Sequence, residues 1–154
     1  MAAPVPLSRF TSFGPACLSS DVGRARVMIE SLEDANAFAK WWAAAWNRRD
    51  IEPVLEHFAE NVAFTSPTAL AVAGVRTVNG KEALRGYGSQ ALTRIRSLRF
   101  IVDRVVWDSQ NRELAIIYTS EIDGTTKRVS ENLTFDRAGR VVTAEVFHGV
   151  TRQP

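Results

Sequence analysis

The spacing of hydrophobic residues along the chain changes once, at Leu98. Before that point apolar residues recur every three or four positions, which is typical of helices with one buried face. After it they alternate with polar residues, which is typical of strands that bury one face. Helices followed by consecutive hairpin-linked strands predict an α+β domain with an antiparallel sheet.

The helical half contains recognisable start and stop signals. Ser31 followed by Asp34 resembles a capping box and predicts a helix start. A second, shorter helix and a short strand follow, and the strand is expected to end at Ser66–Pro67. The small-residue stretch 68–79 is expected to be a loop, and Gly80 leads into a third helix.

The second half predicts four strands joined by turns. Asp123-Gly124 is the strongest hairpin signal, because both residues tolerate positive φ. The strands are expected at 98–107, at 114–122, over a segment that ends at Phe135, and at 140–150.

The 154 residues fit a single domain with one substantial core. We expect a poorly ordered N-terminal tail at residues 1–29 and a folded domain at residues 30–151. The tail has three prolines and no periodicity, and an alternative is that the natural protein begins at Met28. No apolar stretch approaches the roughly 18 residues of a membrane span, so no membrane partner is expected.

Charge gives little reason to expect a nucleic-acid partner. The net charge is +2, but three of the 19 basic residues and one of the 17 acidic residues precede Met28, which leaves 16 of each in the domain. A local cluster of arginines is interpreted as a solvated rim. Its members are Arg94, Arg96, Arg99 and Arg104.

Cysteine occurs once, at Cys17 in the tail, so no intrachain disulfide or thiolate metal cluster can form. This is compatible with a reducing compartment, and a cytoplasmic location is expected. The sequence has no zinc-ligand spacing, nucleophile elbow, phosphate-binding glycine loop or dinucleotide fingerprint. No cofactor and no metal are therefore expected.

Glu131 breaks the pattern of the strand that ends at Phe135. It shares one face with the apolar residues Val129, Leu133 and Phe135. Because burial of an unpaired carboxylate is costly, the side chain should be paired with an arginine, carry a proton at raised pKa, or line a cavity.

His148 breaks the last strand in the same way, since it lies on an apolar row with Ala144 and Val146. The two strands are joined by a tight turn and must be neighbours. Glu131 and His148 lie at different depths from that turn, so direct contact is left open. A carboxyl group and an imidazole that face one cavity form a usable acid–base pair.

Several segments together resemble a known family. The chain is similar to the nuclear transport factor 2-like superfamily, and most of all to SnoaL-like proteins, over about residues 32–150. This resemblance implies a cone-shaped fold in which N-terminal helices pack on a curved antiparallel sheet and enclose a pocket. It leaves the activity open, because the superfamily includes isomerases, dehydratases, cyclases, epoxide hydrolases and non-catalytic binding modules. The segments are Trp-Asn-Arg-Arg-Asp at 46–50, Phe-Ala-Glu-Asn-Val-Ala-Phe-Thr-Ser-Pro at 58–67, Asn-Gly-Lys-Glu-Ala-Leu-Arg at 79–85, Phe-Asp-Arg-Ala-Gly-Arg-Val-Val at 135–142 and Phe-His-Gly at 147–149.

Comparison with ketosteroid isomerase, a well-understood relative, implies roles for four positions. Ser66 stands where that enzyme has its general-base aspartate, and Trp42 stands where it has its oxyanion-hole tyrosine. Glu131 matches its protonated aspartate, and His148 matches an apolar pocket residue. One of the three catalytic positions therefore keeps its carboxyl group, and steroid isomerisation lacks its base here.

These observations predict a pocket for a small apolar or amphipathic molecule, with cofactor-independent acid–base chemistry of the isomerase, dehydratase or hydratase type. Glu131 would be the general acid or hydrogen-bond donor, and His148 a base or second donor. The expected ligand-binding residues are Trp42, Ser66, Tyr87, Tyr118, Val129, Ala144 and Val146.

The alternative is a non-catalytic dimeric module that binds a ligand or another protein. A homodimer through the sheet is expected, because the outward faces of the last two strands are polar and suit a wet interface. A Glu131 bonded to a buried arginine would favour this module, whereas an open apolar cavity with Glu131 at its floor would favour the ligand site. The outward residues are Arg128, Asn132, Thr134, Thr143 and Glu145.

Overall fold

The computed structural model describes residues 28–152. Residues 1–27, which make up nearly all of the predicted tail, lie outside the described part. The helices are α1 (Leu32–Asn47), α2 (Glu52–Glu56), α3 (Pro67–Ala73) and α4 (Lys81–Thr93). The strands are β1 (Phe58–Thr65), β2 (Thr77–Asn79), β3 (Leu98–Asp108), β4 (Glu113–Ile122), β5 (Thr125–Phe135) and β6 (Val141–Arg152).

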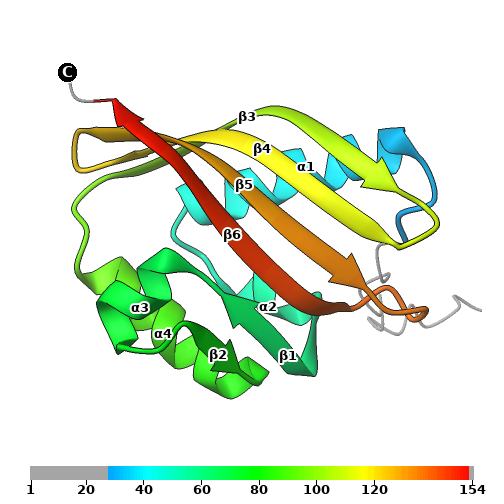
Figure 1. Ribbon diagram of the computed structural model, residues 1–154, viewed down its shortest axis with the longest axis horizontal. Coiled ribbons are helices and arrows are strands. Elements are labelled where there is room, and N and C mark those ends of the chain that lie inside the picture. Colours follow the sequence, from blue (N-terminus) through cyan, green and yellow to red (C-terminus); the bar gives the residue numbers. More distant parts are fainter. Residues whose placement is uncertain (1–27, 153–154) are drawn as a thin grey trace, which may run out of the picture.

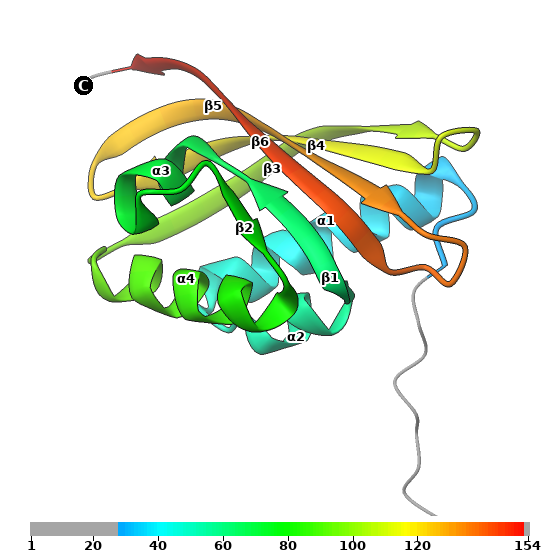
Figure 2. The same ribbon diagram turned by 60° about the horizontal axis from the view of Figure 1, so that its bottom comes forward.

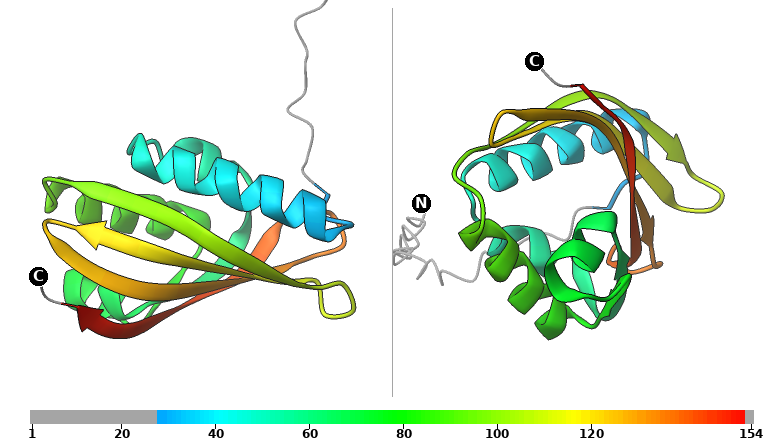
Figure 3. Two further views of the ribbon diagram at one scale, coloured as in Figure 1. Left: turned by 90° about the horizontal axis from the view of Figure 1, so that it is seen from above. Right: turned by 60° about the vertical axis from the view of Figure 1, so that its left-hand side comes forward.

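The six strands form one sheet in the order β2-β1-β6-β5-β4-β3 (Figure 1). The sheet curves around a concave face that α1, α2 and α4 cover (Figure 2). Seen from one end, strands and helices surround a common interior (right-hand view of Figure 3). No helix in the described part of the chain is long and apolar enough to span a membrane. The α+β cone of helices on a curved sheet is confirmed.

The expectation of an all-antiparallel sheet is wrong for one pair of strands. The long strands β3 to β6 pair antiparallel, as their alternating pattern predicted. β1 instead pairs parallel with β6, with Phe64 opposite Ala144. Alternation of apolar residues shows which face is buried but not the direction of the neighbouring strand, so the sequence pattern could not reveal this pair.

The expected loop at 68–79 is also wrong, because α3 and β2 occupy most of it. Ser66 is the N-cap of α3, and its hydroxyl oxygen accepts a hydrogen bond from the Thr68 amide at 3.1 Å. Gly74 ends the helix in the left-handed conformation, with φ of 72°. Only Ala69 of this helix is buried, so α3 has no large apolar face to mark it in the sequence.

α1 packs against β3, the strand at one edge of the sheet, and against its neighbour β4. The predicted capping box is confirmed, since Ser31 and Asp34 bond each other's backbone amides. Trp42 is fully buried on the sheet-facing side, and its ring stacks on Phe100 of β3 at 5.6 Å between centroids. The ring also meets Tyr118 of β4 edge-on at 5.1 Å. These aromatic contacts fix α1 across β3 and β4.

Asn47, the last residue of α1, binds the backbone of the edge strand. Its side-chain amide donates to the Phe100 carbonyl at 3.0 Å, and its side-chain oxygen accepts from the Phe100 amide at 2.7 Å. This pair of bonds imitates the pairing of a neighbouring strand, so it satisfies two backbone groups that an edge strand would otherwise leave to water. It also fixes the backbone of Phe100.

The inner face of the long strands is packed with side chains at one end only. The buried residues Leu114, Leu133 and Val141 fill the end near the turn between β5 and β6. The other end of the strands lies near the hairpin that joins β4 and β5. There the inner face carries polar residues that border a cavity. The fold therefore places a solid core and a hollow site along the same strands.

The two hydrogen bonds between the Asn47 side chain and the Phe100 backbone, here called the Asn47 clamp, yield a stability prediction. Asn47→Ala should lower the free energy of unfolding by about 1 kcal/mol, because two hydrogen bonds to the edge strand are lost and water replaces them only in part. The control is Asn36→Ala, which removes a bond within α1 from Asn36 to the Leu32 carbonyl. Denaturant unfolding should show a change below about 0.5 kcal/mol for the control. Equal losses in both variants would contradict the clamp.

Candidate active site

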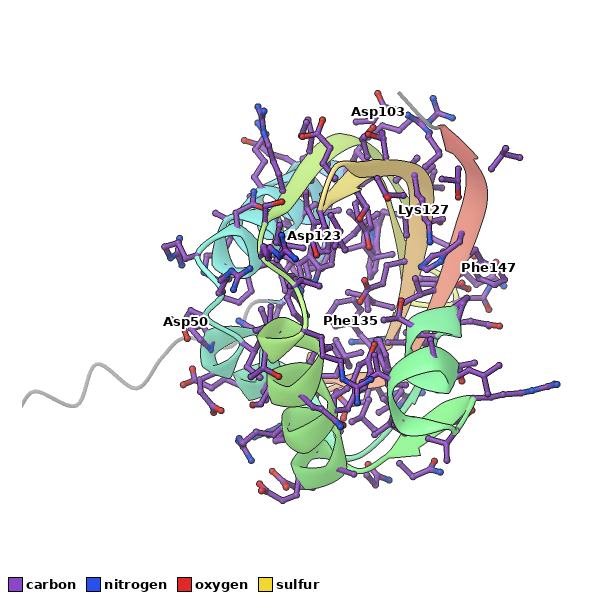
Figure 4. The ribbon with its side chains drawn as sticks, turned by 90° about the vertical axis from the view of Figure 1, so that its left-hand side faces the viewer. Asp50, Asp103, Asp123, Lys127, Phe135 and Phe147 are labelled. Carbon is purple, nitrogen blue, oxygen red and sulfur yellow. The ribbon has the colours of Figure 1, made fainter. Side chains whose placement is uncertain are left out.

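The site is a cavity of about 500 Å³ between the hollow end of the sheet and helices α3 and α4. Its lining is mostly apolar, and this size and character suit a small organic ligand. Figure 4 looks along the molecule from the left-hand side of Figure 1, with Phe135 inside and Phe147 pointing away from the interior. The predicted site residues that line it are Ser66, Tyr87, Tyr118, Val129, Glu131, Val146 and His148.

Glu131 lines the buried part of the cavity. It lies on β5 with Ile116 opposite on β4 and Val146 opposite on β6, and its side chain is buried. Burial raises the pKa of the Glu131 carboxyl from 4.5 to about 8, while a hydrogen bond from Tyr118 acts in the opposite direction. At neutral pH the group is therefore mostly a protonated carboxylic acid, which can donate a hydrogen bond.

Tyr118, Val129 and His148 form one row across the inner face of β4, β5 and β6. Burial, together with the negative charge that Glu131 can carry, raises the pKa of the Tyr118 phenol well above its usual value. Tyr118 therefore stays protonated over the whole physiological range. The row brings a phenol and an imidazole to either side of Val129, with Glu131 next to them and deeper in the cavity.

His148 is the basic group of this row. Its side chain is half-buried, and burial together with the neighbouring Lys127 charge lowers its pKa from 6.5. The imidazole is therefore neutral at neutral pH and can accept a proton. Glu131 and His148 are diagonal neighbours across two strands, a relation that separates Cα atoms by about 7–8 Å. One ligand between them is within reach of both.

The opposite wall carries the remaining predicted polar residues. Tyr87 of α4 lies beside Ser66 and Thr68 in the lining, and burial raises its pKa to about 12. Its ring packs at 5.5 Å from that of Phe64. Ser66, the N-cap of α3, and the phenol of Tyr87 thus form one polar cluster. This cluster faces Glu131 across the mostly apolar interior of the cavity.

The alternative in which Glu131 is held by a buried arginine is not what the structure shows. The ion pairs of the described residues do not include Glu131, and its side-chain hydrogen bond is to Tyr118. No group of three or more His, Cys, Asp or Glu side chains within residues 28–152 is arranged to hold a metal ion.

Two of the predicted ligand-binding residues do not reach the cavity. Trp42 lies behind Phe100 and Tyr118, and its indole N–H has no hydrogen-bond partner within the described residues. Ala144 belongs to the packed end of the sheet, where it lies opposite Leu133. Trp46, one turn after Trp42 along α1, lines the cavity instead.

The sequence reasoning missed charged residues that line the cavity. Lys127 lies on the inner face of β5, two residues before Val129 and four before Glu131. Extending the alternation of that strand backward from Glu131 would have found it. Arg94, interpreted from the sequence as part of a solvated rim, also lines the cavity while its side chain is exposed.

The raised pKa of Glu131 predicts a pH-dependent stability difference between the wild type and Glu131→Gln. Between about pH 4.5 and 8 the unfolded chain releases this proton and the folded protein retains it, so stability is lost as pH rises. The slope should approach about 1.4 kcal/mol per pH unit in the wild type relative to the variant. Denaturant unfolding of both proteins across this range measures it, and a difference independent of pH would refute the assignment.

Comparisons with known proteins agree with this fold. Residues 38–151 match the family model described as a SnoaL-like domain. A SnoaL-like protein of unknown function from Burkholderia thailandensis superposes with a TM-score of 0.67 at 27% identity, over 75% of this chain and 94% of the other. No curated protein matches the sequence.

Two further solved structures share the fold. A steroid delta-isomerase from Pseudomonas aeruginosa has a TM-score of 0.58 at 18% identity, over 75% of this chain and 80% of the other. The epoxide hydrolase/cyclase-like enzyme SalBIII, associated with pyran ring formation in salinomycin, has a TM-score of 0.63 at 15% identity, over 79% and 95%. Because the family model covers most of the folded domain, the chain belongs to the SnoaL-like family, within a fold that also includes isomerases and cyclases.

Proposed function

We propose that this protein is an enzyme that binds a small, mostly apolar molecule in the cavity and performs acid–base catalysis on it without a cofactor. The observation that carries the proposal is a buried carboxyl group beside a phenol in a mostly apolar cavity, without an ion-pair partner in residues 28–152 and with a half-buried imidazole in the adjacent row. Perturbed pKa values gathered in one concave site favour catalysis over a purely structural role.

Glu131 is the proton donor in this proposal. Tyr118 lies beside the Glu131 carboxyl group, which in its protonated form carries the proton to be donated. That proton meets a carbonyl, hydroxyl or epoxide oxygen of the ligand. As negative charge develops on the ligand oxygen, a donor in a dry site stabilises it more than water would.

His148 is the proton acceptor. It removes a proton from an atom near the oxygen that Glu131 activates. In a dehydration Glu131 protonates the departing hydroxyl, which leaves as water, and hydration is the reverse. In an isomerisation His148 returns its proton to another carbon while the enol gives its hydroxyl proton back to Glu131. Ser66 and Tyr87 orient a second polar group from the opposite wall, and Val129 and Val146 contact the apolar body. The isomerase and the cyclase-like enzyme that share the fold use related reaction classes, which supports this choice.

A substrate screen tests the proposal. Small apolar ketones, alcohols, epoxides and lactones are incubated with the protein, and conversion is followed by mass spectrometry. For any substrate found, Glu131→Gln and His148→Ala should each lower kcat at least about 100-fold, the usual contribution of a general acid or base. Activity should fall as pH rises through about 8, where Glu131 loses its proton.

The binding step has a matched control in the same variant. Glu131→Gln keeps the shape and a hydrogen-bond donor but cannot ionise. Binding of tetralone, an apolar ketone, should weaken above about pH 8 in the wild type and stay constant in the variant. Unchanged turnover and binding in both variants would overturn the catalytic assignment.

A second candidate function is dimer formation through the outer face of the sheet. Large apolar side chains are exposed on this face: Ile101 is 40%, Val106 54% and Phe147 50% accessible. They lie among polar residues such as Arg128 and Asn132, a mixture that suits a wet interface. Large apolar side chains exposed on one face of a sheet suit an interaction surface.

The dimer proposal is tested by mass in solution. A chain of 17.1 kDa should elute and scatter light as a particle of twice that mass. Phe147→Asp should shift the protein toward the monomer, because a carboxylate would be buried without a partner at the interface. Arg137→Gln at the turn between β5 and β6 is a surface control. A wild-type monomer at high concentration would exclude the dimer.

A further inference from the structure

Two cations stand at the hairpin end of the cavity without counter-charges. Lys127 extends from the inner face of β5, and Arg94 is the C-cap of α4. Neither side chain forms an ion pair or a hydrogen bond with any other residue between 28 and 152. Figure 4 labels Lys127 on β5 and Asp123 in the turn of the same β4–β5 hairpin. A pair of unneutralised cations at a cavity entrance attracts anions.

The acidic groups nearby do not neutralise this end. Glu131 is the acid of the lining, and it is mostly uncharged at neutral pH. Asp123 lies outside the lining, where it accepts hydrogen bonds from the backbone amides of Arg96 and Ser97, each at 2.8 Å, and it forms no ion pair with Lys127 or Arg94. Glu121 lies on the outer face opposite Arg99, with 4.0 Å between the charged atoms. The lining thus presents positive charge at one end and a neutral donor at the other.

The spacing of these groups sets a length for the ligand. Lys127 and Glu131 are four residues apart on the same face of β5, which separates their Cα atoms by about 13 Å. Val129 lies between them, and Val146 and Leu92 extend the apolar surface. The flexible Lys127 side chain can shorten the distance between the two polar ends.

We propose that the ligand is an amphipathic acid, whose anionic group is held by Lys127 and Arg94 while its uncharged oxygen function meets Glu131. This inference rests on the proposed ligand site and adds the class of molecule that enters it. An apolar body of the size of two fused rings or a medium-length alkyl chain spans the two ends. The anion remains near solvent, so its charge is not fully desolvated on binding.

Two fluorescent probes with the same aromatic framework test the proposal: 1-anilinonaphthalene-8-sulfonate is anionic, and N-phenyl-1-naphthylamine is neutral. Both should bind the wild type. In the double variant Lys127→Gln/Arg94→Gln the Kd of the anionic probe should rise about tenfold, with little change for the neutral probe. Raising the salt concentration should weaken only the anionic probe.

A second double variant, Lys40→Gln/Arg137→Gln, makes the same charge change on exposed residues outside the cavity lining and should leave both probes unaffected. Displacement of the anionic probe by decanoate or by decyl phosphate, but not by decanol, identifies the anion class. Suppose that both probes bind the wild type. If the cavity variant then weakens both probes equally, or weakens neither of them, this inference fails while the ligand site stands. If neither probe binds the wild type, the ligand site and this inference fail together.

Discussion

Core side chains cover only part of the length of the inner face of the long strands. The character of the site depends on the part that they leave uncovered. Where Leu114, Leu133 and Val141 occupy the face, the sheet is packed as a core. Farther along the same strands the residues that replace them are Tyr118, Glu131 and His148, and a cavity separates this part of the sheet from α3 and α4. A carboxyl group placed on this hollow surface loses bulk water without gaining a charged partner, so it retains its proton. The raised pKa of Glu131 is thus a result of where core packing ends along β5.

The helices contribute differently to this arrangement. α1 is fixed to the sheet by the ring of Trp42 and by the bonds of Asn47, which hold Phe100 in place and make one wall of the cavity rigid. α3 and α4 form the opposite wall with few large side chains. Tyr87 and the capping residue Ser66 supply its polarity, so the same serine that starts a helix also faces the ligand space. Structural and chemical roles are therefore shared by single residues rather than separated.

Alternation along single strands was sufficient to place Glu131 and His148 inside, because an inward-facing polar residue is visible in any correctly assigned strand. It was not sufficient to separate Trp42 from Trp46. Both lie on the buried side of α1. Which of them reaches the cavity depends on where β3, which carries Phe100, crosses the helix. The parallel pairing of β1 with β6 was inaccessible for a similar reason, since partner direction is a property of two distant segments. α3 was missed because alanines gave it no large apolar face, although a capping serine and a terminating glycine were present.

The bonds between Asn47 and the backbone of Phe100 have a consequence for how copies of this protein meet. A sheet with an open edge can recruit strands from other molecules and grow into aggregates. At one edge of this sheet, α1 lies across β3 and occupies part of its outward hydrogen-bonding row. At the other edge, β2 is only three residues long. Both edges are therefore poor templates for strand addition, which protects the protein from edge-to-edge aggregation while the broad outer face stays accessible.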